Sequence, residues 1–292
     1  MGTYAVTGSA SGMGKATADQ LRAAGHKVIG VDLKDAEVTA DLSTSAGRTA
    51  AAAEVLKLAT TGLDGAVLAA GLGPGPGDSR SRLIIGVNYF GVVDLLAAWR
   101  AELAKSGNAK VVIFSSNSTT TTPVVPGSTI KALLAGNAEK AIGSVKKFGK
   151  NASAFAYAGS KIGVSRWMRR NAVTAEWAGA GIRLNAIAPG AILTPLLQAQ
   201  LDDPELAGAI EGFPIPLGTY GQADQIAQWV VFMLSPAADF MTGSLVFVDG
   251  GTDALFRSDD WPVTVPLTKL GRYLRITKEF NARKAAARAA KG

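Results

Sequence analysis

The feature of this chain that most restricts its fold is the alternation of short, continuously apolar segments with stretches of helix-forming residues. The apolar segments are Tyr4–Val6, Lys27–Val31, Gly65–Ala69, Lys110–Phe114 and Gly181–Ile187. The helices expected between them cover about Gly12–Ala24, Ser45–Leu58 and Val87–Ala104. Strands that are apolar along their whole length have both faces buried, and strand–helix alternation is typical of a parallel sheet. We therefore predict an α/β fold with a parallel sheet covered by helices on both faces.

The composition excludes several classes of protein. A chain of 292 residues with 48% hydrophobic content is long enough to bury a large core. It has no cysteine, which excludes disulfides and cysteine-bound metals, and its single histidine, His26, excludes a site with several histidine ligands. We expect no membrane span, because no run of eighteen apolar residues occurs. An apparent strand begins at Thr3 without a charged or cleavable leader before it, so we expect a cytoplasmic protein.

The positive charge is concentrated at the C-terminal end, which divides the chain into two parts. Of the net charge of +7, residues 257–292 carry +6, from nine basic and three acidic side chains, and residues 1–256 carry +1. We predict a main domain in the first part and a basic extension in the second. Because the main domain is nearly neutral, we expect no nucleic-acid partner. In the extension, Leu270, Leu274 and Phe280 predict an amphipathic helix, for which three roles stay open: docking on a subunit, weak contact with an anionic membrane surface, or a solvated end.

A long excursion at residues 117–156 interrupts the alternation. It begins with a threonine-rich stretch and continues with apolar residues at three- and four-residue steps, which predict one helix over about 127–148. Plain surface cover, a role in oligomerisation and shaping of a substrate site are the alternatives for this helical insert.

The turn after the first strand has the composition of a phosphate cradle. It reads Thr7-Gly8-Ser9-Ala10-Ser11-Gly12-Met13-Gly14. Its three glycines permit a tight turn, let the backbone approach a pyrophosphate and leave the first helical N–H groups free to bind it. The second strand ends in Asp32, whose carboxylate suits the ribose hydroxyls of adenosine and repels a 2′-phosphate. The sequence therefore predicts a preference for NAD over NADP.

Tyr157 and Lys161 stand one helical turn apart and are predicted to share a helix face. A free tyrosine has a pKa of about 10, and a neighbouring ammonium favours the phenolate, so we expect Lys161 to lower the pKa of Tyr157. The strand before them ends in Ser115-Ser116, and the end of such a strand faces the ligand crevice of the sheet. Together these residues predict a site for proton transfer.

These motifs together resemble the short-chain dehydrogenase/reductase family. The residues that carry the resemblance are TGSASGMG at 7–14, Asn88 in VNYFG, FSS at 114–116, YAGSK at 157–161, NAIAPG at 185–190 and VDGG at 248–251. They follow the order of the family over nearly all of residues 1–256, and the stretch from Ala24 to Thr44 is most similar to the 3α-hydroxysteroid dehydrogenase/carbonyl reductase branch. The resemblance implies a single Rossmann-type doubly wound sheet, to which the helical insert and the basic extension are added.

The resemblance also implies catalytic and cofactor-binding residues. Tyr157 is expected to act as general acid/base on the substrate oxygen, and Ser116 to hold and polarise that oxygen, with Ser115 as the alternative serine. Lys161 is expected to bind the nicotinamide ribose, and Asn88 to anchor a water in a proton relay behind it. The residues implied to bind the cofactor, NAD, are Gly8, Ser11, Gly12, Met13, Gly14, Asp32, Asp41, Leu42, Ala70, Gly71, Tyr157, Lys161, Pro189, Gly190, Ile192 and Thr194. No metal is implied.

One motif departs from the family pattern. The usual Asn-Asn-Ala-Gly is replaced by Leu68-Ala69-Ala70-Gly71. The replacement removes an amide that is expected to brace the central sheet, whereas the Ala-Gly backbone beside the cofactor is kept.

The activity that the resemblance implies is NAD(H)-dependent interconversion of a secondary alcohol and a ketone. The expected small-molecule substrate is a hydroxysteroid or a similar bulky alicyclic compound, covered by the apolar side chains of the segment 192–215, among them Leu196, Leu197 and Phe213. Small cyclic, terpenoid or xenobiotic carbonyl compounds are the alternative substrates, and a cofactor-sensing binding protein is the alternative from another class. The resemblance also implies a homo-oligomer, either a dimer or a tetramer.

Overall fold

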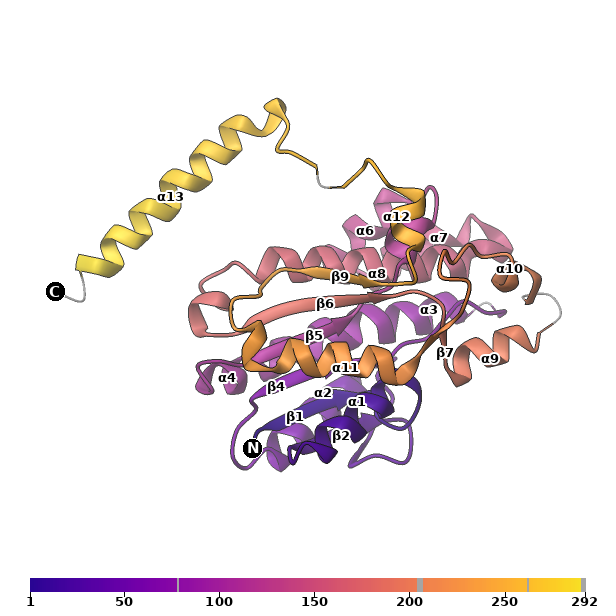
Figure 1. Cartoon of the computed structure of the whole chain (residues 1–292), viewed down its shortest axis with the longest axis horizontal. Coiled ribbons are helices and arrows are strands. Elements are labelled where there is room, and N and C mark those ends of the chain that lie inside the picture. The colour runs from indigo at the N-terminus through magenta and orange to yellow at the C-terminus, as the bar shows by residue number, and fades with distance from the viewer. Residues whose placement is uncertain (78, 204–206, 262, 290–292) are drawn as a thin grey trace. The chain divides into compact units, whose positions relative to one another are not determined.

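Seven parallel strands form the main sheet in the computed structural model of this protein, in the order β3–β2–β1–β4–β5–β6–β9 (Figure 1). The structure describes residues 1–77, 79–203, 207–261 and 263–289. The strands are β1 (Thr3–Thr7), β2 (Lys27–Asp32), β3 (Val38–Thr39), β4 (Gly65–Leu68), β5 (Lys110–Phe114), β6 (Arg183–Pro189) and β9 (Leu245–Val248), with β7 (Ile192–Leu193) and β8 (Gly221–Gln222) as a separate pair. The order reverses between β1 and β4, which confirms the predicted α/β class and the doubly wound parallel sheet.

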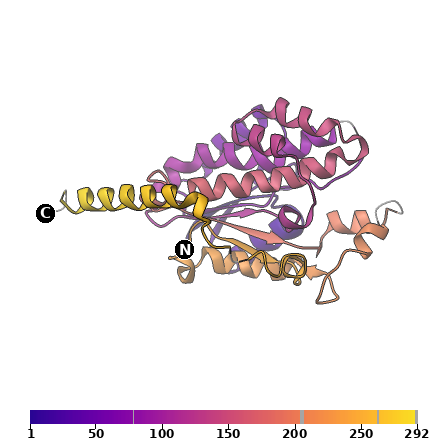
Figure 2. The same cartoon turned by 90° about the horizontal axis from the view of Figure 1, so that it is seen from above.

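Helices cover both faces of this sheet, as predicted (Figure 2). One face carries α1 (Gly12–Ala23) and α11 (Ala223–Leu234). The other face carries α2 (Ser45–Leu58), α4 (Gly91–Lys105) and α8 (Ala152–Asn171). Each layer encloses its own buried apolar cluster, with Leu21 and Val230 on the first face and Leu95 and Trp99 on the second. Because both faces are covered, the central strands are apolar throughout, which is the pattern seen in the sequence.

One helical run begins two turns before the predicted start at Val87. It joins α3 (Arg80–Ile85) through a π-helical turn, η1 (Gly86–Phe90), to α4. By length and composition alone this run is apolar enough to cross a membrane, which the sequence analysis did not anticipate. Of its most apolar window, 61% is buried inside the fold, so the run packs here as a core helix.

The insert before α8 contains two main helices, so the prediction of one helix over 127–148 is wrong. Its elements are α5 (Ser118–Thr121), α6 (Gly127–Leu134), α7 (Ala138–Lys146) and η2 (Gly149–Asn151). The break between α6 and α7 occurs because Gly136 takes a positive φ of 72° and the Asn137 side chain accepts the Lys140 N–H at 2.9 Å, which caps α7. Both helices pack against α3 or α8.

Contacts divide the chain into two compact units, Met1–Phe256 and Arg257–Gly292. The first unit also contains η3 (Ala178–Ala180), α9 (Pro195–Leu201), α10 (Ala207–Glu211), η4 (Pro236–Ala238) and α12 (Thr252–Phe256). The second unit contains η5 (Leu267–Lys269) and α13 (Leu270–Ala289), the helix predicted for the basic extension.

The turn between β1 and α1 lies directly against the segment after β4. Gly8 has a φ of 72°, and a Cβ atom placed on it would lie 2.8 Å from the backbone nitrogen of Ala70. A Cβ atom on Gly14 would collide with the Gly8 carbonyl oxygen. The Ala70 N–H donates to the Thr7 hydroxyl at 3.1 Å, so a threonine braces the two strands at the position where the family amide is missing. Glycine is therefore required at both positions by close backbone approach.

Replacing Gly8 by alanine is expected to destabilise the protein more than the same change at Gly107. Gly107 has a φ of 67° and open space around it, so Gly107→Ala measures the positive φ alone, about 1 kcal/mol. Gly8→Ala adds the collision with Ala70, and we expect a loss of about 3 kcal/mol in unfolding free energy. Urea titration of both variants measures the difference. Equal losses would contradict a tight approach of β1 and β4.

Candidate active site

A cavity of about 520 Å³ opens at the carboxyl ends of β1, β2 and β4, beside the point where the strand order reverses. Doubly wound sheets bind their ligands at this position, and the volume is typical of a small-molecule site. The predicted cofactor-binding residues that line it are Gly8, Ser11, Gly12, Met13, Gly14, Asp32, Asp41, Leu42, Ala70, Gly71 and Thr194. The fold therefore brings residues from five separate segments of the chain to one cavity.

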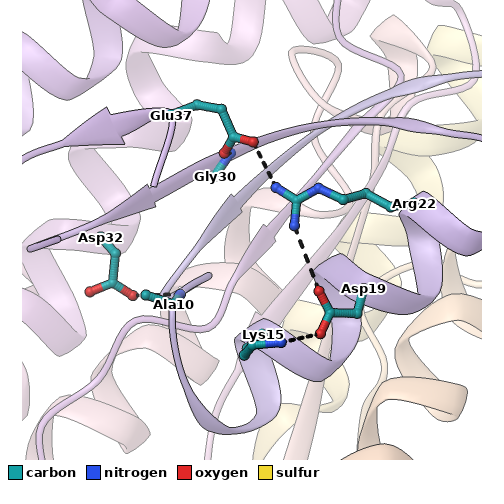
Figure 3. A network of polar contacts seen from close by, with 7 residues as sticks. All are labelled: Ala10, Lys15, Asp19, Arg22, Gly30, Asp32 and Glu37. Carbon is teal, nitrogen blue, oxygen red and sulfur yellow. Dashed lines mark hydrogen bonds and ion pairs between the residues drawn. The ribbon is translucent and has the colours of Figure 1, made fainter. Parts of the chain in front are cut away.

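Asp32 is fixed in the cavity wall by backbone hydrogen bonds to both of its carboxylate oxygens. Oδ2 accepts the Ala10 N–H at 2.9 Å, and Oδ1 accepts the Leu33 N–H at 2.7 Å. Figure 3 shows the carboxylate turned toward Ala10 in the glycine turn. Each oxygen keeps a further lone pair, so the carboxylate is oriented and still able to accept from ribose hydroxyls.

Two cations of α1, Lys15 and Arg22, are both paired with carboxylates. Arg22 donates to Glu37 at 2.8 Å, and Asp19 lies between Arg22 and Lys15 (Figure 3). Burial raises the pKa of Glu37, but hydrogen bonds from backbone N–H groups and the Arg22 charge outweigh it and hold that pKa below its usual value. Lys15 and Arg22 are thus engaged in ion pairs with the protein's own carboxylates. This suits a cofactor whose adenosine ribose carries no 2′-phosphate for a cation to bind.

Helix α8 brings Tyr157 and Lys161 onto one face, as their spacing predicts. The Lys161 Nζ atom lies 5.9 Å from the centre of the Tyr157 ring and donates to the Phe114 carbonyl oxygen at 2.8 Å. The Lys161 side chain is buried, and this burial lowers its pKa to about 8. The ammonium is therefore held at the end of β5, next to the phenol.

The charge state of Tyr157 differs from the sequence argument. We expected Lys161 to lower the pKa of Tyr157, but in the structure that pKa is raised, because burial disfavours the phenolate. The opposing influence is a hydrogen bond with the Ser116 side chain, which lowers the pKa less than burial raises it. The phenol is consequently a protonated group at neutral pH, and Ser116 is its polar partner.

The two serines at the end of β5 have different partners, which distinguishes them. The Ser115 hydroxyl hydrogen bonds to the Ser165 hydroxyl at 2.8 Å, on the buried side of α8. The Ser116 hydroxyl accepts the Ser118 N–H at 3.1 Å and interacts with the phenol. Of the two candidates left open by the sequence, Ser116 is the one that lies beside Tyr157.

Asn88 links the cavity to this group through the backbone after β4. It is fully buried on the π-helical turn η1, where its Oδ1 accepts the Leu72 N–H at 2.8 Å and its Nδ2 donates to the Leu72 carbonyl at 3.0 Å. A Cβ atom on the adjacent Gly71 would lie 3.5 Å from Asn88 Oδ1 and 3.7 Å from Lys161 Nζ. The cavity and the catalytic candidates therefore meet at Gly71. The expected water-anchoring role of Asn88 stays a prediction.

Five of the predicted cofactor-binding residues do not line the cavity: Tyr157, Lys161, Pro189, Gly190 and Ile192. Pro189 ends β6, Gly190 follows it, and Ile192 begins β7. The Pro189 carbonyl accepts the Asn117 N–H at 3.0 Å, and the Gly190 N–H donates to the Val248 carbonyl at 3.1 Å. They share the carboxyl edge of the sheet with the cavity. Among the residues that the structure describes, no cluster of His, Cys, Asp or Glu side chains could hold a metal ion.

Arg80 is a cavity residue that the sequence analysis missed. Its Nε and Nη2 atoms donate to the Gly73 carbonyl oxygen at 2.9 and 2.7 Å, and it lines the cavity together with Leu83 and Val87. Arg80, Leu83 and Val87 have helical spacing, which is visible in the sequence. Arg80 and Leu83 were missed because they precede the predicted helix start at Val87.

Comparison with known proteins gives matches from residue 4 to residue 253. A family model described as enoyl-(acyl carrier protein) reductase matches residues 140–253, and one described as NAD dependent epimerase/dehydratase family matches residues 4–139. The chain is 41% identical over 260 residues to the 3-alpha-hydroxysteroid dehydrogenase/carbonyl reductase of Comamonas testosteroni, which covers 88% of this chain and 98% of that protein. It is 28% identical over 267 residues to the galactitol 2-dehydrogenase (L-tagatose-forming) of Cereibacter sphaeroides, with 85% and 93% covered.

Two solved structures are similar to this one. The 3-alpha-hydroxysteroid dehydrogenase from Pseudomonas sp. B-0831, complexed with NADH, has a TM-score of 0.81 and 42% identity, with 88% of this chain and 99% of that chain covered. Levodione reductase has a TM-score of 0.67 and 29% identity, with 86% and 97% covered. Both similarities extend over nearly the whole of the other chain.

The lowered pKa of Lys161 predicts a pH-dependent contribution to stability. Its pKa is about 8 in the folded protein against 10.5 ordinarily, so between these values the unfolded chain binds more protons, and stability rises with pH. From pH 7 to pH 10, the unfolding free energy of the wild type should gain on that of Lys161→Met by on the order of 2 kcal/mol. Urea titrations at the two pH values measure this gain.

The comparison isolates the titration of Lys161 from its other contacts. The hydrogen bond to Phe114 is lost in Lys161→Met at both pH values, so its contribution cancels in the difference. A difference between wild type and variant that does not change with pH would mean that burial leaves the pKa of Lys161 at its ordinary value.

Proposed function

Because the chain belongs to the short-chain dehydrogenase/reductase family, we propose that it is an NAD(H)-dependent oxidoreductase that interconverts a secondary alcohol and a ketone. The observation that carries the proposal is the meeting of the cavity with the Tyr157, Ser116 and Lys161 group at Gly71. A proton donor, a polar partner for an oxygen and a cation thus lie beside a cavity of cofactor size. This combination suits hydride transfer to or from a carbon that bears oxygen.

The cavity residues fit a nicotinamide dinucleotide. Gly8, Ser11, Gly12 and Gly14 of the glycine turn line the cavity at the start of α1, where the N–H groups of the first helical turn suit a pyrophosphate. Asp32 is oriented to accept from the adenosine ribose, and Leu42, Leu83 and the neighbouring apolar residues suit the adenine ring. When bound, the nicotinamide ring supplies or accepts the hydride.

The protein residues supply proton transfer and electrostatic stabilisation. Tyr157 gives a proton to the substrate oxygen in ketone reduction and takes it back in alcohol oxidation. Ser116 holds that oxygen by a hydrogen bond, and the Lys161 ammonium stabilises the negative charge that develops nearby. Burial raises the pKa of the Tyr157 phenol, which favours the protonated form that ketone reduction requires.

We propose a hydroxysteroid or a similar bulky alicyclic compound as the substrate. The names of the Comamonas and Pseudomonas relatives support this class. The start of α9 supports it as well, since Pro195 and Leu196 line the cavity and Leu196 exposes 44% of its surface beside it. Small cyclic, terpenoid or xenobiotic carbonyl compounds are the alternative, since an apolar cover also suits them. The galactitol relative shows that related chains can act on polar alcohols.

Tyr157→Phe is expected to lower kcat by about 10²- to 10⁴-fold, because the variant lacks the proton that the substrate oxygen needs. The measurement is reduced nicotinamide formed from NAD⁺ with a panel of 3α- and other hydroxysteroids and small cyclic alcohols. Tyr273→Phe, an exposed tyrosine of α13, is the matched control and should keep full activity.

The outcomes of this panel separate the mechanism from the substrate. Full activity of Tyr157→Phe contradicts the proposed proton transfer. Turnover of small alcohols alone keeps the mechanism and rejects the steroid class. An absence of turnover, with NAD⁺ still raising the Tm, favours a cofactor-sensing protein over an enzyme.

Asp32→Asn is expected to reduce the preference for NADH over NADPH at least tenfold, because it removes the charge that repels a 2′-phosphate. The preference is measured as the ratio of the two Kd values by fluorescence titration. Asp35→Asn is the matched control, since Asp35 lies three residues further along, is exposed, and has a φ of 53° that asparagine also adopts. An equal change of the Kd ratio in both variants would mean that the preference depends on the overall charge of the protein and not on the position of Asp32.

A further inference from the structure

Over residues 270–280, helix α13 has one apolar face and one basic face. At 100° per residue, Leu270, Tyr273, Leu274, Ile276 and Phe280 fall on one arc of the helix, which we call the apolar face. The opposite arc, the basic face, carries Arg272, Arg275 and Lys278, and the separation ends beyond Phe280, where Lys284 falls on the apolar arc. Within the second unit, no described residue covers the apolar face, since residues 263–286 are all exposed. An amphipathic helix with an exposed apolar face requires a covering partner.

The second unit adds both charge and length to the family domain. Residues 257–292 carry +6, whereas the preceding 256 residues carry +1. The matched family models end at residue 253, and the Comamonas relative is covered over 98% of its length by 88% of this chain. The excess positive charge of the protein is therefore confined to a segment outside the matched domain. Its role is separate from cofactor binding.

The arrangement of the two faces decides which partner fits. A nucleic acid would engage the basic face and leave the apolar face in water. A neutral protein groove would cover the apolar face and leave the charges unused. An anionic lipid surface engages both at once, because acyl chains cover apolar residues while the headgroups attract Lys and Arg. Trp261, which precedes the helix and is exposed, is of the type enriched at such interfaces.

We propose that residues 257–292 are a membrane-surface anchor, in which α13 lies in the plane of an anionic lipid surface with its apolar face in the boundary between headgroups and acyl chains. The basic face then lies toward the headgroups and water. The anchor binds reversibly and needs no membrane-spanning segment.

The test uses the full chain and vesicles, and it needs no substrate. Co-sedimentation is measured with phosphatidylcholine vesicles and with vesicles that contain roughly one-third phosphatidylglycerol. We expect at least tenfold stronger binding to the anionic vesicles. Leu274→Gln with Phe280→Gln, which changes only the apolar face, should lose binding to the anionic vesicles at least tenfold.

Two further double variants separate charge from position. Arg272→Gln with Arg275→Gln, on the basic face, should weaken binding to anionic vesicles and bring it close to that for phosphatidylcholine. Lys57→Gln with Lys105→Gln removes the same charge from exposed lysines of the main domain and should leave vesicle binding unchanged. All variants should keep the wild-type Tm of the main domain, which shows that the substitutions leave its fold intact.

Several outcomes would overturn the proposal. The first is an absence of binding to either vesicle. The second is loss of binding in the basic-face variant while the apolar-face variant binds normally, which means charge attraction alone. The third is binding to RNA or DNA but not to vesicles. The fourth is an oligomer that the apolar-face variant dissociates, with no vesicle binding, which makes a second copy of the chain the partner.

Discussion

The site depends on the close approach of the β1 turn to the segment after β4. Gly8 lies against the backbone of Ala70, and the Thr7 hydroxyl holds that backbone at 3.1 Å. From this point the contacts continue without a gap: Gly71 lines the cavity, Asn88 pairs with Leu72, and Lys161 lies beside both Asn88 and Gly71. The approach of the glycine turn to Ala70 therefore places Gly71, in the cavity wall, next to the catalytic candidates Asn88 and Lys161.

Burial shifts the pKa values of the two titratable groups of α8 in opposite directions, and in each case it favours the neutral form. The Lys161 pKa of about 8 leaves the ammonium charged at neutral pH, whereas the phenol of Tyr157 stays protonated. A buried phenolate is stable only beside a cation, because a lone buried charge costs several kcal/mol. Lys161, whose Nζ atom lies 5.9 Å from the centre of the Tyr157 ring, supplies such a cation one helical turn away.

The parts of this structure that could be predicted are those that depend on residues adjacent in the sequence. Apolar runs predicted the strands, the glycine turn predicted the cradle, and the motifs in their order predicted the family and the fold. Arg80 was missed because the helical run extends through the π-helical turn η1 to residues before the predicted helix start at Val87. The break at Gly136 was visible as a glycine, but the periodicity on either side outweighed it. The hydrogen bond from Lys161 to Phe114 joins residues 47 positions apart, and the raised pKa of Tyr157 arises from burial in the folded chain, so neither is contained in a local pattern.

The proposed substrate and the proposed anchor are linked by partitioning. A bulky alicyclic alcohol has a large apolar surface and concentrates in lipid for the same reason that apolar side chains are buried in proteins. An enzyme that α13 holds at the lipid surface would meet such a substrate at its concentration in the bilayer, which is higher than its concentration in water. The gain is of the same kind as the raised effective concentration that a tether gives to two binding partners. The exposed Leu196 at the cavity suits a substrate that arrives from an apolar phase. The sequence places no catalytic candidate in residues 257–292, so the proposed anchor would act on substrate capture and leave the proposed chemistry at Tyr157 unchanged.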